Sequence, residues 1–460
     1  MVETISGREQ TPNPPEDSVM PPGLRHAYWF AAFNALSFPI VLSNPMILYG
    51  KTLGAGATVL GIIAGMMPLL VIFQIPAANY VARVGYKRFV YAGWGTRVMF
   101  IFAMALVPLT GGFLDATTRL ALLLLLLFCF NLSRGISSCA WLPWITTLVP
   151  ADRRGRYLAQ DAACQNLSSF LTFVIAALVL GEAPQPGRFA VIFAFSAVMG
   201  AVSLGFLKRI PDVPIPEATR TSRTPVPWLA MARYEPFRRL LWAAAAWSVA
   251  YGGVTAFTVA YLKSSAGMGE GRILLVTSVM YLGGLSSLWL LGARLDRLGS
   301  KPVLIVALGF WLLILGGWLV LAGGGWPATM PVILSLEVLM GLFSAVVTMA
   351  FMRLAMGVIP EMGRSHFFAL YSVITSVSLG LAPIGWGLMI DAVGSWRAQA
   401  GGLEWNRFTL FFAAANATLL IALGLTRRLH EPTAAGMAAV LREIKFPSPG
   451  RIWRKLRPRE

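Results

Sequence analysis

The 460-residue sequence is poor in charge and in residues that bind metals. Only 13% of the residues are Asp, Glu, Lys or Arg, 57% are hydrophobic, and the mean hydropathy is +0.67. A soluble domain carries about 25% charged residues. The three histidines form no metal-like cluster, and the three cysteines (Cys129, Cys139 and Cys164) lie within apolar stretches. We therefore expect a membrane protein without a metal, a cofactor or a disulfide.

Sequence signatures of several other protein classes are also missing. The chain has no GxxxxGK[ST] phosphate-binding loop, so we expect no ATP-driven step within it. No nucleophile and base stand in a catalytic arrangement, and residues 1–24 are polar and rich in proline, unlike a secretory signal. We therefore expect a membrane protein that is not an enzyme.

Apolar segments of membrane-crossing length recur about twelve times along the chain. A helix needs about 20 residues to cross about 30 Å of hydrocarbon. Runs such as 120–128 are continuously apolar, which favours helices over the alternating strands of a barrel. The expected spans are 25–49, 56–82, 89–110, 117–148, 157–181, 188–208, 238–263, 271–293, 301–323, 329–358, 367–392 and 406–427.

The short loops between these spans differ in positive charge from one side of the membrane to the other. Loops on one side carry groups of Lys and Arg, whereas the opposite loops carry isolated cations such as Lys51, Arg119 and Arg188. Loops rich in Lys and Arg stay in the cytoplasm. We therefore expect a multi-pass protein of a cell inner (cytoplasmic) membrane with both termini in the cytoplasm. The grouped cations are Arg83, Lys87, Arg88, Arg153, Arg154, Arg156, Arg294, Arg297, Lys301 and Arg364.

Two of the cationic loops recur at a spacing of roughly 210 residues. Residues 78–87 align without gaps with 292–301. Residues 149–157 align with 359–367, because both contain a proline, an arginine four residues later and a closing aromatic residue. The two matches indicate a duplicated six-helix unit.

The duplication divides the chain into two halves and three polar segments. The halves are residues 25–208 and 237–427. The polar segments are the N-terminal tail 1–24, the linker 209–236 and the basic tail 428–460. The tail interleaves cations with Ile452, Trp453 and Leu456, as in a segment held at the membrane surface by anionic lipids. A solvated, disordered tail is the alternative. A net charge of +18 would suggest nucleic acid as a partner of a soluble protein, but at a membrane we expect none.

The spacing of Gly292, Asp296-Arg297, Gly299 and Lys301 resembles the signature loop of major facilitator superfamily transporters. In that family the loop joins the second and third helices of each half. The resemblance covers about residues 25–427 and implies an all-α membrane protein with twelve transmembrane helices in two pseudo-symmetric six-helix halves. It also implies that the halves rock about a site near the membrane midplane.

The two copies of the signature loop differ in charge. Asp296 occupies the acidic position of the second copy, where the first has Ala82, and Arg353 near the end of the tenth span has Pro143 as its counterpart. The resemblance implies that the acid contacts a cation on a neighbouring helix and latches the cytoplasmic gate, so we hypothesise an Asp296–Arg353 pair. The alternative is that both charges face water. The expected gating residues are Gly292, Asp296, Arg297, Gly299 and Arg353, with Arg83 and Gly85 in the first copy.

Arg134 lies about halfway along the fourth expected span. A charge in hydrocarbon is costly and usually faces a cavity or a partner, and the resemblance makes the first, fourth, seventh and tenth helices cavity-lining. Arg134 is therefore a candidate ligand for a carboxylate or phosphate of the solute. The alternative is a structural arginine bonded to carbonyls or serines. For Arg97, in the third span, we expect a structural role.

Two acids are candidates for carrying a proton. Glu337 is the deepest acid of the second half, and Asp161 lies about one turn into the fifth span. For Asp161 we prefer a pairing with cations at the start of its helix. Further cavity candidates are polar, and each serves equally well as a helix–helix contact. They are Asn34, Ser37, Asn131, Gln165, Tyr251 and Thr255.

The sequence thus predicts a secondary active transporter that moves a small solute by alternating access. We expect a proton-coupled symporter or antiporter of an anionic or carboxylate solute, acting as a monomer without a cofactor. An exporter of amphiphilic drug-like compounds is the alternative within transport. A transporter-like receptor or scaffold that no longer cycles is the alternative outside it.

Overall fold

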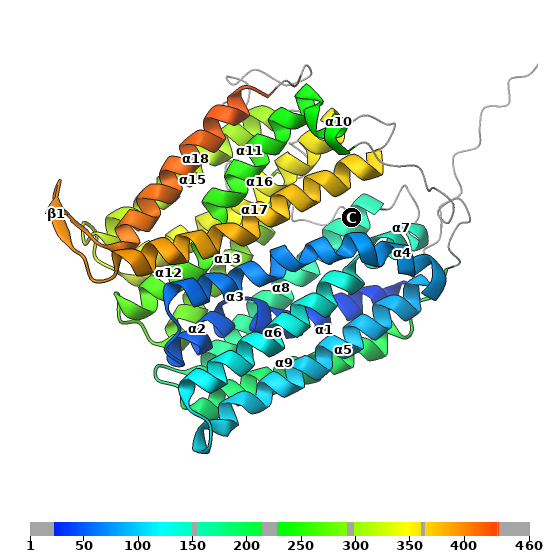
Figure 1. Cartoon of the computed structure of the whole chain (residues 1–460), viewed down its shortest axis with the longest axis horizontal. Coiled ribbons are helices and arrows are strands. Elements are labelled where there is room, and N and C mark those ends of the chain that lie inside the picture. Colours follow the sequence, from blue (N-terminus) through cyan, green and yellow to red (C-terminus); the bar gives the residue numbers. More distant parts are fainter. Residues whose placement is uncertain are drawn as a thin grey trace, which may run out of the picture.

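The computed structural model describes residues 23–149, 154–213, 228–291, 299–359, 364–429 and 431. Among them are 11 helical segments long and apolar enough to cross a membrane. The 22-residue helix α13 (Glu270–Leu291) packs among these segments at the place of the eighth expected span. The all-α, two-half architecture predicted from the sequence is confirmed (Figure 1).

The first half contains helices α1 to α9, some of which are two parts of one span. Their bounds are α1 Arg25–Leu42, α2 Asn44–Thr52, α3 Ala57–Leu69, η1 Leu70–Phe73, α4 Gln74–Val84, α5 Tyr86–Leu106, η2 Val107–Gly112, α6 Ala116–Ser138, α7 Trp141–Leu148, α8 Arg154–Leu180 and α9 Pro186–Leu207.

The second half follows a short helix, α10 (Trp228–Arg233), which lies in the segment that we expected to be a linker. Its helices besides α13 are α11 Glu235–Tyr251, α12 Val254–Ser264, α15 Ser300–Ala322, α16 Met330–Val358, α17 Arg364–Val393 and α18 Arg407–Arg427. The antiparallel strands β1 (Ala398–Ala400) and β2 (Leu403–Trp405), which the sequence did not predict, form a hairpin before α18.

Several predicted spans are divided into more than one helix, and the breaks in the first and seventh bear on the site. The first breaks at Ser43 and the seventh at Gly252–Gly253, where Gly253 has a φ of +85°. That left-handed conformation suits glycine, which has no β-carbon. The break places the two predicted cavity residues of this span on different helices, Tyr251 at the end of α11 and Thr255 at the start of α12.

The geometry of the described residues supports the internal duplication. Gly85 and Gly299 occupy the same place in the aligned loops, and both have a left-handed φ, +92° and +80°. Each glycine caps the start of the next helix, α5 or α15. The helix breaks at Ser43 and Gly252 are also separated by the repeat spacing. The two halves thus share local backbone geometry as well as sequence.

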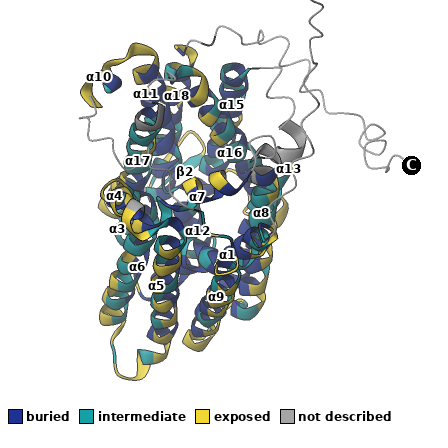
Figure 2. Ribbon diagram, turned by 90° about the vertical axis from the view of Figure 1, so that its right-hand side faces the viewer, coloured by how far each residue is buried: buried dark blue, intermediate teal, exposed yellow. Residues whose placement is uncertain are grey.

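Both ends of the described chain lie on one side of the bundle, which we call the terminal face; the other side is the opposite face. The extensive contacts between the described parts of the halves join α3 to α17, α8 to α13 and α2 to α12. Neither α4 nor α7 takes part in them. Figure 1 accordingly shows the halves together near α2 and α12 and apart near α4 and α10, and Figure 2 looks onto the separated ends.

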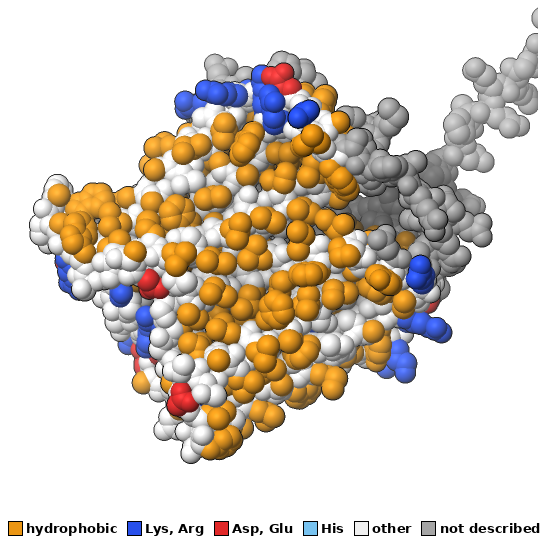
Figure 3. Space-filling view, viewed as in Figure 1, with side chains coloured by type: hydrophobic (Ala, Val, Ile, Leu, Met, Phe, Trp, Pro, Cys, Tyr) orange, Lys and Arg blue, Asp and Glu red, His pale blue; other side chains and the backbone are white. Residues whose placement is uncertain are grey.

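The surface between the two faces is apolar. Figure 3 shows hydrophobic side chains across the breadth of the bundle and charged side chains gathered at its ends. Large exposed side chains such as Met99, Phe102 and Leu313 belong to this belt. A belt of this kind suits contact with lipid tails.

Candidate functional site

A cavity of about 140 Å³ lies between the two halves, at the breaks in the first and seventh spans. Ser43 and Asn44 line it from the first break, and Tyr251 and Thr255 line it from the seventh. Pro68 of α3 and Pro383 of α17 complete the lining where these helices cross. Broken helices expose backbone polar groups to a solute, and transporters use them at their binding sites.

Glu337 lies behind this cavity in the second half, two turns into α16. Its side chain is only 2% exposed, and it interacts electrostatically with the hydroxyl groups of Tyr251 and Tyr281. The Tyr281 hydroxyl also interacts with Ser43. The centre of the Tyr281 ring lies 5.2 Å from the centre of the Phe173 ring of α8. Tyr281 therefore lies near Glu337 and also reaches Ser43 of the first half.

A second polar group lies inside the first half, between α1, α5 and α6. The Trp94 indole N–H donates to Asn34 Oδ1 at 3.3 Å, and the Arg97 guanidinium lies 3.7 Å from the centre of the Trp94 ring. Arg134 is partly exposed and interacts electrostatically with Arg97. Asn131, one turn before Arg134 on α6, is buried and donates from Nδ2 to the Leu127 carbonyl.

Other predicted residues have contacts within their own half. Gln165 Nε2 donates to Asp161 Oδ2 at 2.6 Å, so these two candidates lie together on α8. Ser37 is buried and its carbonyl accepts from Ser196 of α9 at 2.8 Å, which is a helix-packing contact.

The predicted gate is described only in part. Gly292, Asp296 and Arg297 lie outside the described residues, so the Asp296–Arg353 pairing stays a hypothesis. Arg83 is exposed at the end of α4, and Arg353 lies in the last turns of α16. In the second half, Glu431 accepts from the backbone N–H groups of Ser300 and Lys301 at 2.9 and 2.6 Å, which fixes the start of α15.

The opposite face has a contact between the halves that the sequence did not reveal. Asp391 of α17 accepts hydrogen bonds from the backbone N–H groups of Ala57 and Thr58, at 2.9 and 2.7 Å, and from the Thr58 hydroxyl at 2.7 Å. The free N–H groups at the start of α3 are thus satisfied by an acid from the other half. The only hint in the sequence was an acid near the end of an apolar span.

The start of α13 is held across the halves in a similar way. The Gly271 N–H donates to the Gly181 carbonyl at 2.6 Å, and Arg272 pairs with Glu182 at 2.6 Å. Both contacts lie on the opposite face. The described conformation is therefore closed at that face by two sets of polar contacts.

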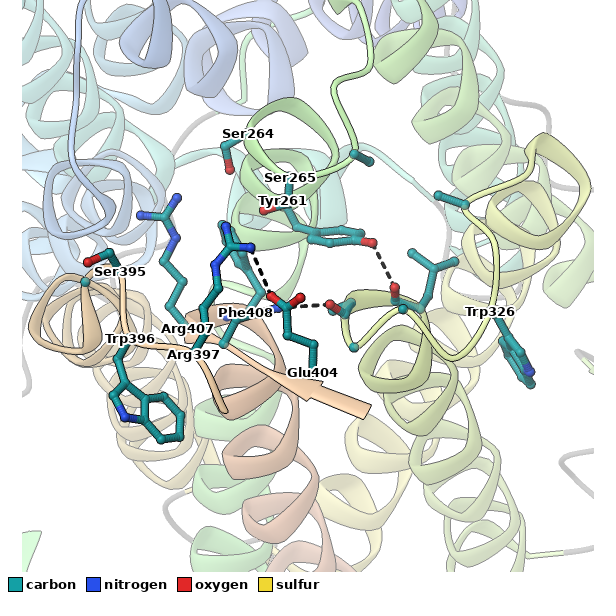
Figure 4. Close-up of a pocket in the computed structure, with 18 residues that line it drawn as sticks. Tyr261, Ser264, Ser265, Trp326, Ser395, Trp396, Arg397, Glu404, Arg407 and Phe408 are labelled. Atoms are coloured by element: carbon teal, nitrogen blue, oxygen red, sulfur yellow. Dashed lines mark hydrogen bonds and ion pairs between the residues drawn. The ribbon is translucent and has the colours of Figure 1, made fainter. Parts of the chain in front are cut away.

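A larger pocket of about 540 Å³ opens on the opposite face within the second half (Figure 4). Arg397 points towards Glu404 there, with 3.3 Å between Nη1 and Oε1, and Arg407, Trp326 and Trp396 also line the pocket. All of its lining residues belong to the second half, although Arg407 also interacts electrostatically with Lys51 of the first half. Within the described residues, no three His, Cys, Asp or Glu side chains are placed to hold a metal ion.

Comparisons with known proteins agree with the fold. A family model described as Major Facilitator Superfamily matches residues 27–336. A D-xylose–proton symporter has a TM-score of 0.70 and 13% identity, over 89% of this chain and 98% of its own. A bacterial homologue of the iron transporter ferroportin, in an inward-facing state, has a TM-score of 0.65 and 15% identity, over 88% and 97% of the two chains.

A nucleoside transporter has a TM-score of 0.67 and 10% identity, over 89% of this chain and 100% of its own. A search of curated proteins gave no match. At these identities the solved structures establish the fold alone, whereas the family model covers well over half of the sequence. The chain therefore belongs to the Major Facilitator Superfamily and is a multi-pass membrane transporter.

Proposed function

We propose that the protein is a proton-coupled secondary transporter of a small anionic solute, with alternating access between the two halves. The observation that carries this proposal is the placement of one buried acid and one partly exposed arginine on different halves, Glu337 and Arg134. A charge within a transmembrane span usually marks a solute or proton pathway.

Glu337 is the proposed proton carrier. A carboxyl group so deeply buried is costly to ionise unless a cation compensates for it. Within the described residues, its electrostatic neighbours are Tyr251 and Tyr281, neither of which carries a positive charge. Tyr281 also reaches Ser43 of the first half, so a change in the charge of Glu337 would act on the boundary between the halves.

Arg134 is the proposed anion ligand. It is partly exposed, whereas a purely structural arginine at this depth would be expected to bond to carbonyls or hydroxyls. None of the hydrogen bonds among the described residues uses its guanidinium. A carboxylate or phosphate of the solute would supply the missing charge.

The terminal face is proposed to be cytoplasmic, which makes the described conformation inward-facing. Lys and Arg outnumber acids on this face, as the positive-inside rule expects. The contacts of Asp391 and of Gly271 close the opposite, outer face.

Uptake into proteoliposomes tests the proposal. A panel of carboxylates and phosphate esters is offered with and without an inward pH gradient, and we expect at least one to accumulate only with the gradient. Arg134→Ala should abolish that accumulation, whereas Arg88→Ala, which removes an exposed cation of the terminal face, should not.

Three results would contradict the proposal. Accumulation of anions that persists in Arg134→Ala removes this arginine from the site. Transport of neutral amphiphiles in their place favours the drug-exporter alternative. Transport of no solute in any gradient favours the non-cycling receptor.

A further inference from the structure

Arg97 is a buried cation that no anion compensates within the described part of the chain. Its side chain lies near the middle of α5 and is only 6% exposed, and its Nε and Nη2 atoms have no hydrogen-bond partner. A buried polar group normally has a partner, and a buried charge is costly without one. The sequence suggested a structural role, but the described contacts supply no carbonyl or carboxylate that would define one.

The aromatic rings around Arg97 compensate for only part of this cost. Its guanidinium lies 3.7 Å from the centre of the Trp94 ring and 5.9 Å from that of Phe130. The stabilisation from a desolvated cation–π contact is smaller than the cost of burying an unpaired ion. The rings orient the guanidinium and leave its charge unbalanced.

The charged neighbour of Arg97 is a second cation. Arg134 of α6 interacts with it electrostatically, and the contact of Arg97 with Phe130 places it about one turn further from the terminal face than Arg134. Within the described residues, no Asp or Glu forms an ion pair with either arginine. Two like charges in a low-dielectric interior repel each other strongly, so the pair favours an anion from outside.

We propose that Arg97 and Arg134 together bind a doubly charged oxyanion, such as a phosphate ester or a short dicarboxylate, which makes this the charge class of the transported solute. This inference rests on the proposed function and narrows the class of transported solute from anions to dianions. Two guanidinium groups offer bidentate donors to one phosphate or to two carboxylates. Partly exposed Arg134 meets the anion first, and Arg97 takes the second charge.

A neighbouring acceptor points to a further feature of the ligand. Asn131 Oδ1 is buried without a hydrogen-bond partner, whereas Nδ2 of the same amide donates to the Leu127 carbonyl. This hydrogen bond fixes which amide atom faces away from Leu127. An unsatisfied acceptor about one turn from Arg134 on α6 suits an anion that carries a hydroxyl or amino group next to its charge.

Thermal unfolding of the purified full-length protein in detergent tests the proposal without transport. The probes are acetate, succinate, inorganic phosphate and a phosphate ester, glycerol 3-phosphate, at constant ionic strength in chloride. We expect saturable stabilisation by at least one of the three doubly charged probes and little by acetate. Arg97→Gln and Arg134→Gln should each weaken the apparent affinity about tenfold or more, and Arg88→Gln should not. Comparing the stabilisation by succinate with the stabilisation by the two phosphate probes shows whether the site prefers a dicarboxylate or a phosphate compound.

Arg97→Met separates a ligand from a structural arginine. If Arg97 is an uncompensated cation, its removal leaves the unfolding temperature without ligand unchanged or higher and abolishes the dianion effect. A lower unfolding temperature with an unchanged dianion effect would overturn the proposal. So would stabilisation by none of the probes, or by acetate as strongly as by the dianions.

Failure of this inference differs from failure of the proposed function. Anion transport that depends on Arg134 but not on Arg97 overturns the two-arginine site and leaves the transport proposal intact. Dianion binding that depends on both arginines, without any transport, contradicts the transport proposal and leaves the site intact.

Discussion

Glu337 and Arg134 show how much a single charged residue in an apolar span reveals. Both were predicted as site residues because a charge within about 20 apolar residues stands out. What the sequence did not show is their surroundings. Tyr281 lies far from Ser43 in the chain, and only the folded structure brings it between Glu337 and the first half. Arg97 stood out in the same way, but the lack of an anionic partner for it among the described residues was visible only once its neighbours were placed.

Glu337→Gln should uncouple transport from protons. The amide keeps the shape of the side chain but cannot release a proton, so we expect accumulation driven by a pH gradient to fall to the level of simple equilibration. Solute exchange across the membrane should persist, because it requires no net proton movement. Parallel measurements of gradient-driven uptake and of exchange check this.

Asp161→Asn is the comparison for this prediction. Asp161 already accepts a hydrogen bond from Gln165 in its own helix, so its variant should remain coupled. The assignment to Glu337 is wrong if Asp161→Asn loses gradient-driven uptake and Glu337→Gln retains it.

At the scale of elements, the crossing of α3 and α17 determines how the halves close. Glycines allow the two backbones to approach, because a β-carbon at Gly61 would meet the Pro383 carbonyl and one at Gly65 the Gly380 carbonyl. The spans themselves were predictable from hydropathy. Their breaks at Ser43 and Gly252 and the partner of Asp391 were not, because these depend on residues of the other half.

Asp391→Asn should favour opening of the opposite face. An amide oxygen is a weaker hydrogen-bond acceptor than a carboxylate, and the neutral amide is not attracted to the positive end of the α3 dipole. We expect the substitution to destabilise the closed conformation by about 1 kcal/mol, which shifts the equilibrium between conformations roughly fivefold. Labelling of Thr255→Cys by an impermeant thiol reagent, in a chain without its three cysteines, checks this. We expect faster labelling from the opposite face.

Asp115→Asn is a matched control for that variant. Asp115 also accepts from two backbone N–H groups and a threonine hydroxyl, at the start of α6, but every partner lies in its own half. Its replacement should leave the labelling rate unchanged. Equal effects of the two variants would mean that Asp391 stabilises a helix and does not hold the halves together.

Gly61→Val should prevent tight closure of the opposite face. The added side chain would collide with the α17 backbone at Pro383, which cannot move aside as a flexible side chain would. We expect transport to be lost while the protein still inserts and remains monodisperse. Gly95→Val, where a β-carbon would meet nothing within 4 Å, should transport normally. Normal transport by Gly61→Val would show that the close crossing is dispensable.

At the scale of the whole molecule, the two halves are the moving parts. Their contacts are concentrated towards the opposite face, where Asp391 and Gly271 make hydrogen bonds between them, and are sparse between the described parts at the terminal face. The duplicated architecture was predictable from two short loops, because repeats of sequence imply repeats of fold. The sequence did not predict which face is closed, because this depends on a balance of weak contacts between the surfaces of the two halves.

Distances between spin labels test the central claim, that proton binding at Glu337 moves the halves in alternation. One pair, at Thr52 and Ser265, reports on the opposite face, and the other, at Ala78 and Ser372, on the terminal face. We predict that a change from alkaline to acidic pH shifts the two distance distributions in opposite directions, and that Glu337→Gln removes this dependence on pH. Distances that stay fixed, or that lengthen and shorten together, would contradict the account.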